Sequence, residues 1–450
     1  MWSPDTTQTF GIAMLVSVSA LTLLSGLAVW EVMIAVSTVF AVIGLWLGVF
    51  NLPILGLLAS RLSGLLENDL LQAIPLYVFF GVLLQHSGLA SSMLVLLKRI
   101  CWRLHLPQPL AVLLFAGLIS PMNGSVASTA GLLQRTVDGK RANVDSAATV
   151  SLSSCAATVG LVIPPSLVLI LMGDAMMRAH TEAFNSGLVQ AQGLHVMNTQ
   201  DMFHAALLPG LLVFVLWSLV AAWTFRHADT ESDVPALDTK SLLKAWVAVA
   251  LIVLLLTGVF NGLLYAVEAA ATGCLFLCVY MAWLLRHKLS DWLEIWRDTF
   301  AFSGSLLSLL MAATTFSLVF RLYETDLWIS RWIVNAPADA GHIAVIFAGV
   351  ALCAWMMDAF ELIFVIIPIV SPGLILLMGD ARQVAVLLLL VIQLSFLCPP
   401  FGYAVLIAHQ ADKTITYLRL LKALWPYMFV IGAVCAVLFL YPQWVHLLDT

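Results

Sequence analysis

Long apolar stretches, separated by short polar turns, fill most of this chain. A helix needs about 20 apolar residues to cross the hydrocarbon core of a bilayer. We interpret seven stretches as such spans, at residues 10–29, 32–50, 205–225, 245–261, 263–285, 299–320 and 427–440. The recurrence of these stretches along the chain predicts an all-α polytopic membrane protein.

Four further segments mix apolar and charged positions and are too polar to span. They lie at residues 54–71, 91–105, 286–297 and 326–334. Their charged residues include Arg61, Glu67, Asp69, Lys98, Arg99, Arg103, Arg286, Lys288 and Arg297. Such amphipathic segments are typical of helices that lie in the membrane interface and contact lipid headgroups. A substrate-binding basic patch is the alternative for residues 91–105, and a simple loop is the alternative for residues 286–297.

Two pairs of adjacent prolines interrupt apolar segments and organise the rest of the chain. The pairs are Pro164-Pro165, in a broken helix predicted for residues 145–172, and Pro399-Pro400, in one predicted for residues 385–408. Proline removes a backbone donor and clashes with the preceding turn, so a helix cannot pass undisturbed through two of them. Inside a bilayer, such a break persists only where it is buried or lines a cavity.

Two other apolar segments are broken by polar residues and are predicted to be re-entrant helical hairpins. The first, residues 107–141, is interrupted from Ser120 to Ser125, and the second, residues 341–374, at Asp358, Glu361 and Pro368. The proline pairs are 399 − 164 = 235 residues apart, and the same offset carries Asn123 onto Asp358. Broken elements in matching positions of two halves point to a transporter built from structural repeats.

We therefore expect about ten transmembrane helices, two hairpins and four regions. Residues 1–72 hold N-terminal scaffold helices and an interfacial helix, and residues 73–225 hold the first repeat. Residues 226–289 form a charged linker and further scaffold helices, and residues 290–450 form the second repeat. The segment 173–204 reads as a long polar insertion between spans. It has few basic residues, so we expect it to face outward.

Composition confirms the class and narrows the chemistry. The 450 residues are 62% hydrophobic and 10% charged, with a mean hydropathy of +1.01, whereas soluble domains carry roughly 25% charged residues. The net charge of −5 is scattered through loops, which excludes a nucleic-acid footprint. The seven cysteines stand singly, so packing is favoured over a metal site. The N-terminus has no basic region followed by a cleavage site, so no removable signal peptide is expected.

The breaks are the candidate binding sites. An interrupted helix offers N-termini to anions and free carbonyls to Na⁺. The candidates flanking the breaks are Asn123, Gly124, Ser125, Thr158, Gly160, Pro164, Pro165, Ser166, Asp358, Gln393, Ser395, Pro399, Pro400 and Gly402. We expect Na⁺ near Ser125 and Ser395 and no further cofactor. The plain alternative is that glycine and serine only permit close helix packing. A carboxylate in an apolar run usually faces a cavity or a partner, so Asp358 is a site candidate, with the role of Glu361 open.

At this point the residues resemble a known family. GLVIPPSLVLILMGD followed by LLPGLL, and VIQLSFLCPPFGYAV in the second half, resemble the two signatures of the large membrane subunit of tripartite ATP-independent periplasmic (TRAP) transporters. SPMNGSVASTAG and AWMMDAFELIFVIIPIV resemble that family's two hairpins. The chain departs from many relatives in having Ser128 in place of an acidic residue, Cys398 in place of threonine, and a longer segment 173–204.

The resemblance implies a secondary transporter subunit of a bacterial inner membrane, and not an enzyme. It implies two inverted repeats, an elevator-type mechanism and Na⁺-coupled uptake of an organic acid. It also implies a small four-helix membrane subunit, expected to be a separate chain, and a periplasmic substrate-binding protein. From the polarity of the segment 173–204 and its shortage of Lys and Arg, we expect that segment to help dock the binding protein. Two alternatives remain at this point: a stand-alone Na⁺- or H⁺-coupled anion symporter of related architecture, and, remotely, an intramembrane hydrolase using Ser125 with His342 or His409.

Overall fold

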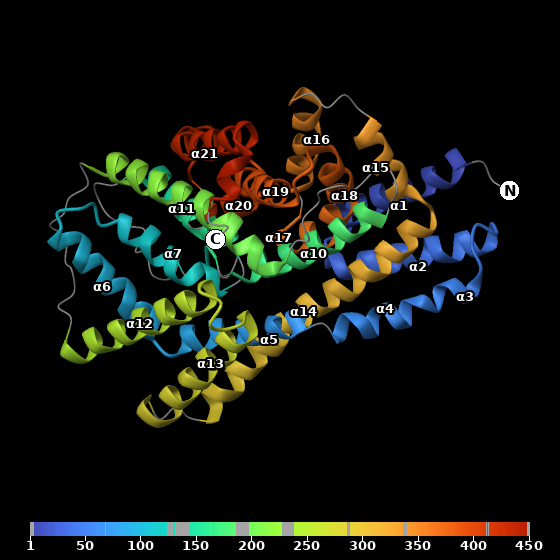
Figure 1. The fold of residues 1–450 in the computed structure, drawn as a ribbon. Coiled ribbons are helices and arrows are strands. Elements are labelled where there is room, and N and C mark those ends of the chain that lie inside the picture. Colours follow the sequence, from blue (N-terminus) through green and yellow to red (C-terminus); the bar gives the residue numbers. More distant parts are fainter. Residues whose placement is uncertain are drawn as a thin grey trace.

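The computed structural model is all-helical over the residues that it describes, which are 4–67, 69–123, 126, 129–130, 133, 145–164, 166–185, 198–226, 238–285, 289–335, 340–355, 357–410, 412 and 414–447 (Figure 1). The helices of the first half are α1 (Pro4–Ser25), α2 (Val29–Trp46), α3 (Leu52–Leu55), α4 (Leu57–Leu66), α5 (Asp69–His86), α6 (Leu89–Arg103), α7 (Leu110–Asn123), α9 (Ser146–Thr158), α10 (Leu167–Asn185) and α11 (Thr199–Thr224). Those of the second half are α12 (Thr239–Phe260), α13 (Ala266–Val279), α14 (Leu289–Leu322), α15 (Thr325–Asn335), α16 (Ala340–Cys353), α17 (Ala359–Glu361), α18 (Ile367–Met378), α19 (Ala381–Phe396), α20 (Tyr403–His409) and α21 (Tyr417–Leu440).

Seven helices among the described residues are long and apolar enough to cross a membrane, or eight if α3–α4 and α5 form one bent span. This is fewer than the ten predicted, because α1 and the broken helices α9 and α19 provide only shorter apolar helices. Conversely, residues Ala359–Met378, most of which were predicted as part of the second hairpin, are long enough to span. The polytopic, all-helical prediction is confirmed, and the last span begins ten residues earlier than predicted, at Tyr417.

Two predicted polar segments are corrected by the structure. Residues 173–185 are not part of a loop-like insertion but continue α10, in which Asp174, Met176 and His180 are buried. The apolar positions of this stretch recur at helical spacing, which the interpretation as an insertion overlooked. Asn198 caps α11, which begins at Thr199, and residues 186–197 lie outside the described part of the chain.

The basic segment 286–297 is likewise not separate from the following span. From Leu289 it forms the first turns of α14, a single helix of 34 residues. At 1.5 Å per residue this helix is about 51 Å long, well beyond a hydrocarbon core of about 30 Å. The charged first turns can therefore lie outside the apolar layer while the helix stays continuous.

The helices pack into one core in which the two repeats meet. α14 packs against α2 and α5, and α13 packs against α5. α9 packs against α20 and α21, while α19 packs against α10 and α11, so each broken helix contacts elements of the other half. The buried Trp217 on α11 donates its Nε1–H to the carbonyl of Tyr427 on α21 at 3.0 Å, which joins the halves again.

The starts of the two broken helices are built alike. α9 and α19 begin after Asp145 and Asp380, which are 380 − 145 = 235 residues apart and cap the helices by accepting from the backbone N–H groups. Each start is also held by an ion pair, from Arg419 to Asp145 at 2.8 Å and from Arg382 to Asp201 at 3.0 Å. The repeat offset found from the prolines is therefore a structural equivalence.

Candidate functional site: two helix breaks and an arginine-lined cavity

The first break separates α9 from α10. α9 ends at Thr158, a 3-10 turn follows at Val159–Leu161, and the chain passes Pro164 before α10 starts after Ser166. The Ser166 hydroxyl accepts from the N–H of Leu169 at 3.1 Å, which satisfies one of the free donors at the new helix start. Thr158 and Ser166 are both fully buried, so the break lies inside the protein as predicted.

Gly160 sets how closely the first hairpin approaches this break. Its N–H donates to the Ser120 hydroxyl on α7 at 3.0 Å. A Cβ at position 160 would lie 2.7 Å from the Ser120 backbone carbon and oxygen, closer than real Cβ contacts. Position 160 therefore needs glycine because the two segments pack closely there. Close packing is the role that the sequence left open as an alternative to ligand binding.

The second break separates α19 from α20 and repeats this arrangement. The Ser395 hydroxyl donates to the Ala351 carbonyl on α16, and 395 − 160 = 235, so Ser395 is the repeat equivalent of Gly160. A Cβ on Gly402 would lie 2.5 Å from the Phe396 carbonyl oxygen. Pro164 is buried, whereas Pro400 is exposed, so the second break is the more open of the two.

The two breaks touch one another at equivalent positions. Gln393 donates from Nε2 to the carbonyl oxygen of Thr158 at 3.3 Å, and its Nε2 lies 3.5 Å from the Thr158 hydroxyl. The two residues are 393 − 158 = 235 apart. Gln393 is fully buried, and its Oε1 has no hydrogen-bond partner among the described residues. The sequence placed these residues in two separate sites, and the structure joins them.

Asp358 and Glu361 form a reciprocal helix cap at the break of the second hairpin. Asp358 Oδ1 accepts from the N–H of Glu361 at 2.9 Å, and Glu361 Oε2 accepts from the N–H of Asp358 at 2.9 Å. The break therefore follows the end of α16 at Cys353 and precedes the start of α17 at Ala359. Glu361 and Pro368 lie within helical structure rather than interrupting it. Capping uses one oxygen of each carboxylate.

Several predicted site residues cannot be placed. Gly124, Ser125 and Pro165 lie outside the described residues, as does the side chain of Asn123 at the end of α7. The expected turn of the first hairpin and the predicted Na⁺ site near Ser125 therefore stay predictions. Over the part of the chain that is described, no cluster of three His, Cys, Asp or Glu side chains could hold a metal ion.

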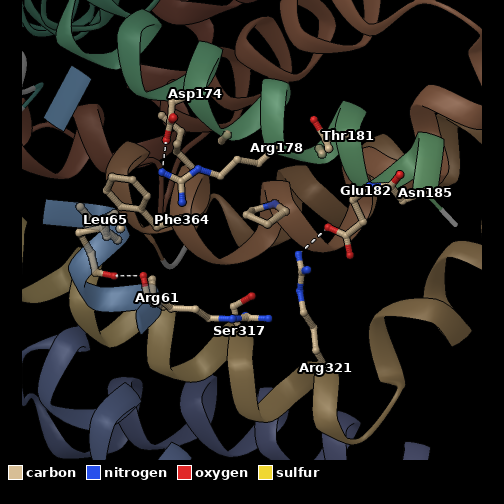
Figure 2. Close-up of a pocket in the computed structure, with 18 of the residues that line it drawn as sticks. Arg61, Leu65, Asp174, Arg178, Thr181, Glu182, Asn185, Ser317, Arg321 and Phe364 are labelled. Carbon is tan, nitrogen blue, oxygen red and sulfur yellow. Dashed lines mark hydrogen bonds and ion pairs between the residues drawn. The ribbon is translucent and has the colours of Figure 1, made fainter. Parts of the chain in front are cut away.

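The structure adds a cavity that the sequence reading missed. It has a volume of about 690 Å³ and lies between α4 and α14 on one side and α10 and the start of α18 on the other. Its charged lining residues are Arg61, Asp174, Arg178, Glu182 and Arg321. Figure 2 shows two ion pairs at this cavity: Asp174–Arg178 within α10, and Glu182–Arg321 between α10 and α14. Small-molecule sites usually occupy about 300–1,000 Å³, so the cavity is large enough for a ligand.

Sequence signals for this cavity existed but were spread over the chain. Arg321 stands at the end of an apolar run, and Glu182 lies in the segment read as an insertion. The two are 321 − 182 = 139 residues apart, and nothing in the local pattern of either indicates the other. A charged residue at the end of a spanning helix could have marked Arg321, because such positions are costly unless paired.

Comparisons with known proteins agree with this architecture. A sequence model of the family described as "Tripartite ATP-independent periplasmic transporter, DctM component" matches residues 15–444. The chain is 23% identical to the C4-dicarboxylate TRAP transporter large permease protein DctM of Rhodobacter capsulatus, over 82% of this chain and 84% of that protein. It is 21% identical to the sialic acid TRAP transporter large permease protein SiaM of Vibrio cholerae, over 87% and 88%.

Two further matches widen the picture. The ectoine TRAP transporter large permease protein TeaC of Halomonas elongata is 23% identical over 54% of this chain and 58% of that protein. The fold is similar to the crystal structure of the YdaH transporter of Alcanivorax borkumensis, with a TM-score of 0.59 and 16% identity, covering 86% of this chain and 87% of that one. Taken with the paired breaks, these matches place the chain in the DctM family, as a large membrane subunit of a TRAP transporter and not an enzyme.

Proposed function

We propose that this chain is the large permease of a Na⁺-coupled carrier for an organic acid, working in a bacterial inner membrane by an elevator mechanism. Its family makes it a multi-pass transporter subunit that acts with a periplasmic substrate-binding protein and a small membrane subunit. The proposal adds the coupling ion, the substrate class and the type of motion to that assignment.

The contact between the two breaks is the observation that carries the coupling proposal. Na⁺ is held in transporters of this general plan by backbone carbonyls freed at interrupted helices. Here Thr158 and Gln393 bring a break carbonyl, a hydroxyl and an unpartnered amide oxygen together in a fully buried place. A buried oxygen without a donor carries a cost that a cation can remove. This arrangement supports one cation-dependent unit formed by both repeats.

Two independent features support an organic acid as the substrate. The relatives named above include carriers named for C4-dicarboxylate and sialic acid. The cavity beside α14 presents the guanidinium groups of Arg61, Arg178 and Arg321, and guanidinium is suited to bidentate carboxylate binding. The relative named for ectoine shows that family membership alone does not set the substrate.

Uptake into proteoliposomes tests the coupling, with candidate binding proteins and a labelled acid such as succinate or sialic acid supplied outside. We expect uptake to require a Na⁺ gradient, and Gln393→Leu to raise the Na⁺ concentration for half-maximal uptake about tenfold, as loss of one cation ligand or its orienting bond would. Gln383→Leu is the matched control, since Gln383 is also buried on α19 but bonds to the Leu438 carbonyl at 2.9 Å, away from the break. Unchanged uptake when choline replaces Na⁺ at fixed pH would reject Na⁺ coupling.

Proton coupling is the second candidate, because Asp358 is a partly buried carboxylate within an apolar element. It predicts uptake that follows an imposed pH gradient without Na⁺ and disappears in Asp358→Asn. The stand-alone symporter is tested in the same vesicles by leaving out the binding protein, since it alone predicts saturable uptake under that condition.

A further inference from the structure

One ion pair bridges the cavity from one helix to another. Arg321 on α14 is bonded to Glu182 on α10, and its Nε lies 4.0 Å from Asp326 Oδ2 on α15 (Figure 2). The side chains of Arg321 and Glu182 are 35% and 20% exposed, so the pair is partly shielded from water. α14 packs with α2 and α5, and α10 packs mainly with α18 and α11 but also contacts α5. The ion pair therefore adds a direct polar link between α14 and the broken helix.

A second arginine shares this space without an ion partner. Arg61 on α4 is exposed, and neither an ion pair nor a hydrogen bond joins its side chain to another described residue. The charges of Arg321, Glu182 and Asp326 all act on Arg61 across the cavity. The cluster therefore holds two guanidinium groups, Arg61 and Arg321, and two carboxylates, Glu182 and Asp326. Both carboxylates lie against Arg321. Arg61 is thus left without an ion pair of its own among the described residues, and an entering anion would supply one.

The remaining lining suits a small polar ligand. Neutral donors and acceptors come from Thr181, Asn185, Thr314 and Ser317, and Phe364 and Pro368 supply apolar wall. A site of this kind, with a mostly apolar wall and a few placed polar groups, is typical of small-molecule binding. Arg178 is already paired with Asp174 at 2.7 Å on the same helix, so that pair does not bridge the cavity.

We propose that this cavity binds a small organic carboxylate between Arg61 and Arg321, and that the bound carboxylate replaces Glu182 on Arg321 and so releases α10 from α14. The inference rests on the proposed function only for the class of ligand. A carboxylate on the ligand can accept the bond from Arg321 Nη2 that Glu182 now accepts, and it gains Arg61 in addition. Ligand binding is thereby linked to the loss of the ion pair between α10 and α14. The ligand shifts the equilibrium between the paired and the released state only as far as it binds the released state more tightly.

Binding to the purified full-length chain tests the site without transport. Heat-denaturation midpoints are measured against increasing succinate, sialic acid and citrate, with equal ionic strength from chloride. We expect at least one acid to stabilise the wild type and Arg61→Gln to lose this stabilisation. We expect Glu182→Gln to tighten the apparent affinity for the acid about tenfold, because the carboxylate that competes for Arg321 is gone. Asp174→Asn is the matched control, since it removes a carboxylate from the same cavity but from a pair within one helix; its affinity should equal that of the wild type.

A charge exchange covers the case in which single changes harm folding. The double variant Arg321→Glu with Glu182→Arg keeps the bridge between α14 and α10 but moves its guanidinium onto α10. We expect normal folding, and an apparent affinity for the acid at least about fivefold weaker than that of wild type, because Arg61 and the exchanged arginine no longer converge. Unchanged affinity in this variant, or in Glu182→Gln, contradicts the exchange, and no stabilisation of the wild type by any of the three acids contradicts the site.

Transport assays separate this inference from the proposed function. Wild-type uptake that depends on Na⁺ but is equal in Arg61→Gln and Glu182→Gln would overturn the inference and leave the function standing. Binding that follows the expected pattern of variants, in a protein that shows no Na⁺-dependent uptake, would do the reverse.

Discussion

At the scale of single residues, the site depends on a few close approaches in the protein interior. Gly160 admits the Ser120 backbone, and Gln393 reaches Thr158 across the two halves. Asp358 and Glu361 cap the start of α17 reciprocally. This structural role explains in part why two carboxylates occur in an apolar segment, where the sequence suggested a binding role. Gln393 Oε1 is one of several buried side-chain atoms without a hydrogen-bond partner among the described residues, and it lies at the contact between the two breaks.

Replacing Gly160 by alanine should destabilise the protein. The new methyl group would lie 2.7 Å from the Ser120 backbone, which cannot rotate away, and overpacking of this kind typically costs about 1–3 kcal/mol. The matched control is Gly304→Ala on α14, where a Cβ meets nothing within 4 Å and helix propensity favours alanine by about 1 kcal/mol. Thermal unfolding in detergent should show a lower midpoint for the first variant and an equal or higher one for the second. Equal midpoints for both would contradict the close contact.

The charge and the capping role of Asp358 can be separated. Asparagine caps helix N-termini about as well as aspartate, whereas alanine costs about 1 kcal/mol there. We therefore expect Asp358→Asn to keep the wild-type unfolding temperature and Asp358→Ala to lower it. If the carboxylate also binds a cation or proton, both variants should lose uptake at least tenfold, an effect of about 1.4 kcal/mol or more. Full uptake in Asp358→Asn would leave this residue a structural cap only.

At the scale of elements, equivalent segments of the two repeats have diverged for local reasons. The offset of 235 places α14, which begins at Leu289, opposite the segment that begins near Ile54. In the first half that segment is divided into α3, α4 and α5, with Glu67, Asn68 and Asp69 at the junction. The equivalent residues of α14 are Phe302, Ser303 and Gly304, which carry no charge, and the helix continues. Three consecutive polar residues therefore account for the different lengths.

The proline pairs carry the strongest prediction at this scale. Replacing Pro399 and Pro400 by alanines restores two backbone donors. Each proline makes a continuous helix less stable by about 3 kcal/mol than alanine does, so the replacement allows the helix to continue through the break. We expect a protein that folds normally but loses Na⁺-dependent uptake, because a re-formed helix withdraws its carbonyls from the cation. Pro426→Ala is the control, since Pro426 lies within the continuous helix α21. Wild-type uptake with wild-type Na⁺ dependence in a well-folded double variant would refute a ligand-binding role for the break.

At the scale of the whole molecule, the broken helix of each half packs against helices of the other half. α9 contacts α20 and α21, α19 contacts α10 and α11, and Arg382 on α19 binds Asp201 on α11. Exposed aromatic residues such as Trp46 and Trp246 lie on α2 and α12, and Trp283 lies in the π-helical turn that follows α13. An apolar exterior of this kind suits lipid and membrane partners.

Orientation in the membrane is tested from the segment that follows α10. Its low content of basic residues predicts an outward, periplasmic position. A cysteine placed at Ser186, in a chain whose seven native cysteines are replaced, should react with an impermeant thiol reagent added to intact cells. Reaction only in inverted vesicles would reverse the predicted topology and with it the docking role of this segment.

The sequence by itself determined the class, most of the spans, the two proline breaks and the repeat offset. Apolar runs and prolines act locally: a run of about 20 apolar residues partitions into lipid, and a proline interrupts the helix that contains it, whatever the rest of the chain does. The family followed from the same motifs, because they combine the breaks with particular flanking residues. Helix ends were less well determined, as the late start assigned to the last span shows.

Only the tertiary structure decided which of these pieces meet. Whether residues 173–185 form an exposed insertion or a packed helix depends on partners supplied by α18 and α19. The contact of Thr158 with Gln393 and the pairing of Glu182 with Arg321 join residues 235 and 139 positions apart, and hydrogen bonds and ion pairs have no period in sequence. Long-range polar contacts are set by how the helices pack, and that packing fixes the cavity and the joined breaks.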